Sequence, residues 1–302
     1  MTAYVLILAS VLGLPKPSKA MQSLFEEGEY FPQSGVLQGE RIRYRLFVPR
    51  DIGKRERCPL FVWMHGFGEG GDDNIRNLQW FGHILRDLAH VEKYRFFLLT
   101  VQCPSKHRQW HRGHRTSSSG EEPDDMLAIN ARIVRKLMEE RPIDKNRVFL
   151  SGVSGGGSVC WVMAARYPDL FSAVVPMASY VHNFADADKL ADMPVWAFNN
   201  TYDYIYSPET AQRMVEAVNA AGGNAHITLV PEKKHTCFIP AFQDHNVLDW
   251  MLAQRRGAWV CWTPPGCRTW SWWHILTVPF GFAAVAWLGL HLRRRRLDKL
   301  AE

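Results

Sequence analysis

The sequence alternates short apolar runs with segments of helical periodicity, and this alternation constrains the fold more than any other feature. The run "PLFVWMH" is continuously apolar up to its last residue, as expected of a strand buried on both faces of a sheet. We expect strands at 41–49, 59–65, 95–102, 147–152, 171–178, 194–200 and 225–231. We expect helices at 75–91, from 124 or 125 to 140, and at 155–167, 208–221 and 244–255. Strands that alternate with helices predict an α/β fold on a doubly wound, mostly parallel sheet, with ligands beyond the carboxyl ends of its strands.

The segment "FLSGVSGGGSVCW" (149–161) places Ser154 among glycines, where an expected strand meets an expected helix. A sharp strand–turn–helix with Gly152 and Gly156 on either side of the turn is typical of a nucleophile elbow. Such a turn holds the serine in strained geometry and points the Gly155 N–H toward a developing oxyanion. A phosphate-binding glycine loop is the alternative, but no Gly-Lys-Ser/Thr supports it. We therefore predict that Ser154 is a nucleophile.

A serine nucleophile needs a base, and the base needs a group that orients it. In this topology the chain order is Ser, then Asp or Glu, then His, each at the end of a strand. Asp203 comes three residues after the strand at 194–200, and His235 comes four residues after the strand at 225–231. His245 is a weaker candidate for the base because it falls inside the last expected helix. The sequence thus predicts a triad of Ser154, Asp203 and His235.

The second donor to the oxyanion is expected from the loop "MHGFGEGGDDN" (64–74), which leaves an earlier strand. Its glycines let the backbone approach a substrate, and we predict that the Phe67 N–H acts beside that of Gly155. The loop also carries three carboxylates that fit no calcium-binding spacing and are expected to be solvated: Glu69, Asp72 and Asp73.

Residues 36–256 resemble the α/β-hydrolase superfamily, and more narrowly its small secreted esterases and predicted peptidases. These are related to prolyl-oligopeptidase catalytic domains, dienelactone hydrolases and polyhydroxybutyrate-depolymerase-type esterases. The resemblance is carried by "YRLFVP", "PLFVWMHGFGEGGDDN", "QCPSKHRQW", "DKNRVFLSGVSGGGSVCWVMAARYPDLFSAVVPMAS", "PVWAFNNTYD" and "PEKKHTCF". It implies the α/β-hydrolase fold, the same triad, and acyl-ester chemistry without a cofactor. Two positions depart from the family pattern: Gly155 stands where Met is frequent, and Asn199-Asn200 stand where His-Gly is usual.

Three further residues are predicted to contact substrate: Trp110, Tyr180 and His182. Trp110 belongs to a long polar loop expected at 103–123, and with Tyr180 it could stack on an aromatic or sugar group. His182 follows the strand at 171–178 and could line the pocket. The histidines of the polar loop are expected to be solvated, and no metal site is predicted.

Both ends of the chain resemble targeting or anchoring segments. Residues 1–20 contain an apolar run followed by Ser-Lys-Ala, as in a signal peptide, although no positive charge precedes the run. Residues 270–292 hold no Asp, Glu, Lys or Arg and are long enough for a transmembrane helix. Tryptophans before it and the basic tail at 293–302 suit the two membrane interfaces, with the tail in the cytoplasm. The order of these features also resembles bacterial sorting tails, some of which are cleaved.

A linker at 257–269 contains Cys261 and Cys267, which could close a small disulfide loop or remain free thiols. The other cysteines are expected to be buried and chemically inert: Cys58, Cys103, Cys160 and Cys237. The formal net charge is +6, but five basic residues lie in the last ten positions. The remaining surplus is small and is no signature of a nucleic-acid partner.

The sequence therefore predicts a membrane-anchored serine hydrolase whose catalytic domain, residues 21–256, lies outside the cytoplasm. We expect cleavage of carboxylic esters of small molecules through an acyl-enzyme. A peptidase acting on short peptides is the nearest alternative, and a catalytically silent, membrane-tethered binding module is the second.

Overall fold

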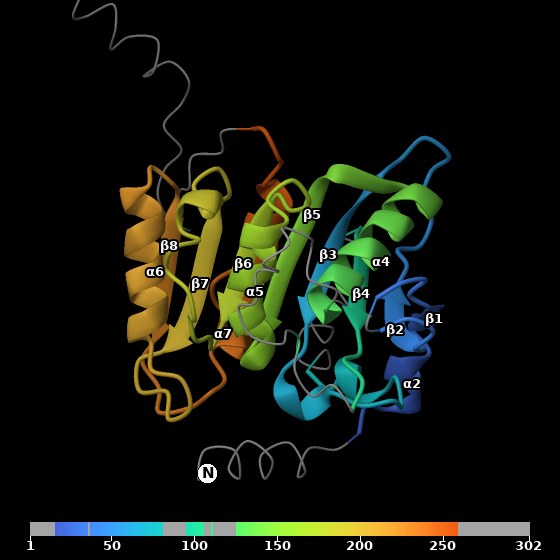
Figure 1. Ribbon diagram of the computed structural model, residues 1–302, viewed down its shortest axis with the longest axis horizontal. Coiled ribbons are helices and arrows are strands. Elements are labelled where there is room, and N and C mark those ends of the chain that lie inside the picture. The colour runs from blue at the N-terminus through green and yellow to red at the C-terminus, as the bar shows by residue number, and fades with distance from the viewer. Residues whose placement is uncertain (1–15, 36, 81–94, 106–109, 111–124, 259–302) are drawn as a thin grey trace, which may run out of the picture. The chain divides into compact units, whose positions relative to one another are not determined.

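A computed structural model of the protein describes residues 16–35, 37–80, 95–105, 110 and 125–258. Within these ranges eight strands form one sheet in the order β1-β2-β4-β3-β5-β6-β7-β8 (Figure 1). The strands are β1 Phe25–Tyr30, β2 Ile42–Phe47, β3 Cys58–Met64, β4 Phe97–Val101, β5 Ile143–Val153, β6 Ala173–Met177, β7 Val195–Asn200 and β8 Ala225–Val230. The strands from β3 to β8 run parallel, whereas β2 pairs antiparallel with both β1 and β4. The predicted mostly parallel α/β sheet is confirmed.

The helices follow the strands as the periodicity predicts. The α-helices are α2 Lys19–Gln22, α4 Met126–Glu140, α5 Gly155–Arg166, α6 Glu209–Ala220, α7 Phe238–Gln243 and α8 Val247–Ala253. The 3₁₀ helices are η1 Phe67–Glu69, η2 Arg76–Leu78 and η3 Asp188–Leu190. Asp125 caps α4 as expected, because its carboxylate accepts the N–H groups of Leu127 and Ala128.

Side chains alternate between the two faces of the sheet, and each face has its own core. In β3, Leu60 and Val62 belong to the core that contains residues of α4, α5 and α6, and α4 and α5 lie on the near face in Figure 1. Phe61 and Trp63 point to the opposite face, where both rings lie 6.3 Å from that of Phe242 in α7. Burial on both faces explains why this strand is apolar throughout.

Three details differ from the sequence-based expectations. β1 was not predicted, because its sequence FEEGEY is rich in residues that disfavour strands, and it forms by backbone pairing at the edge of the sheet. β5 begins four residues before the expected strand. The helix expected at 244–255 is present but shorter, as α8 Val247–Ala253, and an unpredicted helix, α7, precedes it, with Asn246 just before α8 in a left-handed conformation with φ 51°. Asn246 interrupts the helical conformation here because Asn tolerates the left-handed conformation better than most residues do.

None of the helices within the described ranges is long and apolar enough to cross a membrane. The predicted transmembrane segment, basic tail and disulfide loop lie outside the described residues, as do most of the predicted signal peptide and of the helix at 75–91.

Candidate active site

Ser154 lies where β5 turns sharply into α5. Its φ of 59° and ψ of −123° form a conformation that costs a non-glycine residue about 1–3 kcal/mol and is typical of functional sites. The surrounding structure holds it there: the Ser154 N–H donates to the Met177 carbonyl at 3.0 Å, and its carbonyl accepts the Ser158 N–H at 2.9 Å. The predicted elbow is therefore present, with the first N–H groups of α5 directly behind the serine.

The glycines beside Ser154 allow two strands and a helix to approach closely. A Cβ atom on Gly156 would lie 1.9 Å from the Met64 carbonyl oxygen, and one on Gly152 would lie 2.5 Å from the same atom. Both separations are far shorter than van der Waals contact, and the obstructing atom belongs to the backbone of β3. Any side chain at these positions would push β3 away from the elbow.

Asp203 and His235 meet at the carboxyl edge of the sheet. The His235 Nδ1 donates to Asp203 Oδ2 at 2.7 Å, and Asp203 Oδ1 accepts the N–H groups of Ile205 and Tyr206 at 2.8 and 3.0 Å. The Asp203 side chain is fully buried and that of His235 is 12% exposed. The carboxylate thus fixes the orientation and the tautomer of the imidazole.

Ser154 and His235 line the same small pocket, whose cavity volume is about 80 Å³. The Nε2 atom of His235 is buried and has no hydrogen-bond partner among the described residues. It is therefore free to accept a proton, and such hydrogen bonds often form only when a substrate is bound. The rest of the pocket is lined by Gly66, Phe67, Gly68, Glu69, Trp80, Val153, Tyr204, Ile205, Thr236 and Phe238.

Phe67 and Gly155, the predicted oxyanion donors, are neighbours. The Phe67 ring occupies the space of a side chain at position 155, where a Cβ atom would lie 2.7 Å from its Cδ2 atom. This contact explains why position 155 has no side chain. The Gly66 carbonyl accepts hydrogen bonds from His65 Nδ1 at 2.7 Å and from the Glu69 N–H at 3.1 Å. Since the C=O and N–H of a trans peptide point in opposite directions, these bonds also fix the direction of the Phe67 N–H.

His65 is a buried structural residue of this loop. Its Nε2 accepts the Cys103 N–H at 3.0 Å, so its proton resides on Nδ1 and is donated to the Gly66 carbonyl. Burial lowers the pKa of His65 to about 4, which keeps the ring neutral near pH 7. A neutral ring is required because a charged one could not accept the Cys103 N–H.

Trp110 does not fulfil the predicted role in substrate stacking. Its side chain is only 2% exposed, its Nε1 donates to the His65 carbonyl at 3.0 Å, and its ring lies 4.5 Å from that of His65. Trp110 therefore supports the loop at 64–74 from the protein interior, because its indole N–H is bonded to a buried backbone carbonyl of that loop. Tyr180 and His182 are exposed and in ring contact at 5.0 Å, but neither lines the pocket of Ser154.

Several residues that shape the site were not predicted from the sequence. Glu69, expected to be solvated, is 1% exposed and lines the pocket. Tyr204 also lines the pocket and is 58% exposed, and its position beside Asp203 was the available signal. Asn200 replaces the usual glycine and accepts the Thr236 N–H at 3.0 Å, which ties the end of β7 to the residue after His235.

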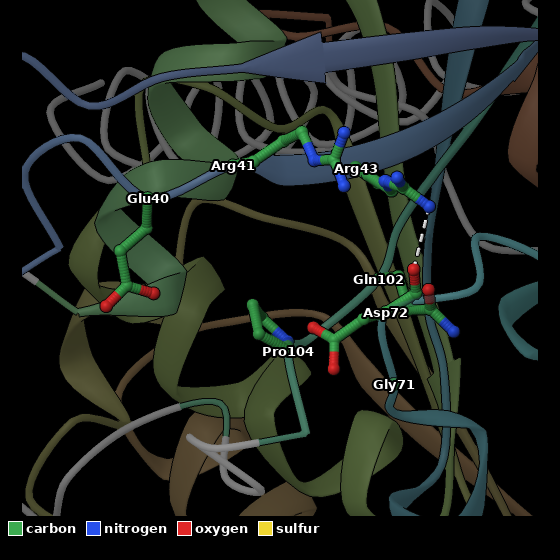
Figure 2. Close-up of a pocket in the computed structure, with 7 residues that line it drawn as sticks. All are labelled: Glu40, Arg41, Arg43, Gly71, Asp72, Gln102 and Pro104. Carbon is green, nitrogen blue, oxygen red and sulfur yellow. Dashed lines mark hydrogen bonds between the residues drawn. The ribbon is translucent and has the colours of Figure 1, made fainter.

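A larger cavity of about 270 Å³ lies elsewhere on the protein (Figure 2). It is lined by Glu40, Arg41, Arg43, Gly71, Asp72, Gln102 and Pro104. Its wall is internally paired: Arg43 donates to the Asp72 carbonyl at 2.8 Å, and both Arg41 and Arg43 lie 3.7 Å from Glu29. The residues that line this cavity include no serine, cysteine or histidine, whereas Ser154 and His235 both line the smaller pocket.

The family follows from comparison with known proteins. Residues 42–202, more than half of the chain, match the family described as esterase PHB depolymerase. The chain belongs to this family. The match includes Ser154 and the loop of Phe67 and ends one residue before Asp203.

Two curated relatives are esterases by name. The chain is 29% identical over 129 residues to an acetylxylan esterase of Coprinopsis cinerea, a match that covers 42% of this chain and 33% of the relative. It is 26% identical over 141 residues to feruloyl esterase B of Neurospora crassa, covering 47% of this chain and 45% of the relative. The chain thus spans less than half the length of the curated relatives that it matches.

Solved structures show the α/β-hydrolase fold. A thermostable esterase superposes with a TM-score of 0.68 at 26% identity, covering 78% of this chain and 64% of the other. A putative dienelactone hydrolase of Klebsiella pneumoniae gives 0.55 at 18% identity, covering 76% and 99%. The acylaminoacyl peptidase of Pyrococcus horikoshii gives 0.54 at 13% identity, covering 80% and 44%, so these last two show the fold alone. The predicted resemblance is confirmed.

Proposed function

We propose that this protein is a serine esterase that cleaves carboxylic esters through an acyl-enzyme. The observation that carries the proposal is the pair of Asp203 and His235, whose free Nε2 shares a small pocket with the strained Ser154. Family membership supports the same chemistry.

In this mechanism the Ser154 hydroxyl attacks the ester carbonyl while His235 Nε2 takes its proton. The N–H groups of Phe67 and Gly155 stabilise the oxyanion of the tetrahedral intermediate, each worth about 10²–10³ in rate. When the intermediate collapses, the bond to the alcohol breaks, and His235 returns the proton to the leaving alkoxide. A water molecule, deprotonated by His235, then attacks the acyl-enzyme, and Ser154 leaves with that proton as the acid is released. Asp203 stabilises the transient imidazolium throughout.

The pocket favours esters with a small acyl group and a large alcohol. The cavity beside Ser154 is small, and the exposed ring of Tyr204 lines it. Two further rings lie nearby: the Tyr206 ring is 5.7 Å from that of His235, and the exposed Tyr180 ring is 6.1 Å from that of Tyr206. Such rings suit stacking against sugar or aromatic groups. We propose acetylated carbohydrates as the substrate class, because an acetyl group suits the small cavity and one curated relative carries the name acetylxylan esterase.

The decisive experiment compares the wild type with Ser154→Ala. We expect the variant to lose turnover of nitrophenyl acetate while its thermal unfolding remains cooperative. A fluorophosphonate probe should label the wild type and not the variant, which separates an enzyme from a silent binding module. A parallel assay on short peptides tests the peptidase alternative. Turnover by Ser154→Ala at the wild-type rate would refute the mechanism.

We also propose that residues 270–292 anchor the enzyme in a membrane, with the catalytic domain outside the cytoplasm. The support is the sequence alone: an uncharged apolar segment between tryptophans and four consecutive arginines. Removal of 270–302 should release the activity from the membrane fraction. Equal amounts of activity in the membranes with and without this segment would contradict the proposal.

A further inference from the structure

Glu69 is a buried carboxyl group inside the candidate active site. Its side chain is 1% exposed, it lines the pocket of Ser154, and it forms no salt bridge among the described residues. Burial raises the pKa of Glu69 well above its ordinary value, against hydrogen bonds from the Gly66 N–H and the Trp80 side chain that lower it. A buried carboxyl without a cationic partner is costly, so its presence here calls for a function.

Its hydrogen bond acts on the loop of the predicted oxyanion donor. Glu69 Oε2 accepts the Gly66 N–H at 2.7 Å, and the Trp110 Nε1 donates to the His65 carbonyl at 3.0 Å. These two groups are the N–H and C=O of one peptide unit, which is therefore held at both ends. The next peptide unit carries the Phe67 N–H, so its orientation depends on the unit that Glu69 holds.

Glu69 is also close to the nucleophile. A methyl group on Gly66 would lie 3.5 Å from Glu69 Oε2 and 3.5 Å from the Ser154 Cβ, so the two side chains flank the same glycine. Gln102 fixes Glu69 from outside, since its Nε2 donates to the Glu69 carbonyl at 3.2 Å. A carboxylate so near a developing oxyanion would repel it, whereas a neutral group with the same acceptor would not.

We propose that Glu69 is a positioning residue for ester hydrolysis: its buried carboxyl group accepts the Gly66 N–H and thereby aims the Phe67 N–H at the oxyanion. This inference rests on the proposed esterase function. It predicts that kcat depends on an acceptor oxygen in the side chain of residue 69 and not on a negative charge there.

A matched pair of variants tests it in the full chain. Glu69→Gln retains an acceptor oxygen without a charge, and Glu69→Met has a similar length without the acceptor. On nitrophenyl acetate we expect Glu69→Gln to keep kcat within about threefold of the wild type. We expect Glu69→Met to lose kcat on the order of 10²-fold, the effect of misplacing a catalytic group by about 1 Å, with KM changed less than about twofold. Binding of a trifluoromethyl ketone, whose hemiketal oxyanion occupies the same position, should weaken in parallel with kcat.

The outcomes are distinguishable. Equal loss of kcat in both variants, or wild-type kcat in folded Glu69→Met, would overturn the proposal. If Glu69→Met does not fold, Glu69→Gln decides: unchanged kcat and ketone affinity support the proposal, and a loss above about tenfold in folded protein overturns it. Failure of the esterase function itself would appear separately, as turnover that survives Ser154→Ala.

Discussion

Acidification should destabilise the folded chain through His65. The ring is fully buried and its pKa is lowered to about 4, whereas the unfolded chain carries a histidine with its ordinary pKa of 6.5. Between pH 6.5 and about pH 4 the histidine is protonated in the unfolded chain but remains neutral in the folded chain. The free energy of unfolding therefore decreases as the pH falls. From pH 8 to pH 5 the loss from this one group is about 2 kcal/mol, and it approaches about 3 kcal/mol near pH 4.

Urea unfolding followed by tryptophan fluorescence measures this loss, with His65→Asn as the control. The Asn amide can donate to the Gly66 carbonyl in place of Nδ1 but does not titrate. All other groups contribute equally to both proteins, so the wild type should lose about 2 kcal/mol more than the variant between pH 8 and pH 5. Parallel curves of stability against pH would show that His65 accepts a proton in the folded state and would refute the reasoning.

Three further predictions concern the elbow, the triad and the thiols. Gly156→Ala places a methyl group 1.9 Å from the Met64 carbonyl oxygen, so we expect a loss of at least about 3 kcal/mol in chemical denaturation. Gly53→Ala, whose Cβ meets only ordinary contacts at 3.6 Å, should change stability little, and equal losses would contradict the steric argument. Asp203→Asn should lower kcat by about 10⁴-fold with the fold intact, and a loss under about tenfold would exclude its role in orienting the base. Cys103 and Cys237 are buried with raised pKa values, so a disulfide reagent should modify them only on unfolding; rapid reaction of the native protein would contradict this.

The parallel core and the elbow were predictable because their signals are local. Apolar runs such as "PLFVWMH" report burial on both faces of a sheet, and Ser154 among glycines reports a turn that few sequences tolerate. Asp203 and His235 were found from chain order, since loops after parallel strands meet at one edge. β1 escaped prediction because its pairing with β2 depends on backbone hydrogen bonds rather than on its glutamate-rich sequence.

The roles of Trp110 and Glu69 could not be read in the same way. A tryptophan in a polar loop and a glutamate among glycines are both expected to face solvent, yet here each is buried against the backbone of residues 65 and 66. The partner of Trp110 lies in another loop, and that of Glu69 lies across a tight turn. The sequence does not reveal either hydrogen bond.

Periodicity and glycine placement act through neighbouring residues, so the order of strands and helices, the serine turn and a candidate acid and base after it can be predicted from the sequence alone. The tertiary fold is needed to see which polar groups are buried, how the peptide units before Phe67 are held, and why position 155 has no side chain. The physical reason is that burial and hydrogen-bond partners are set by segments far apart in the chain, and these come together only when the sheet has formed.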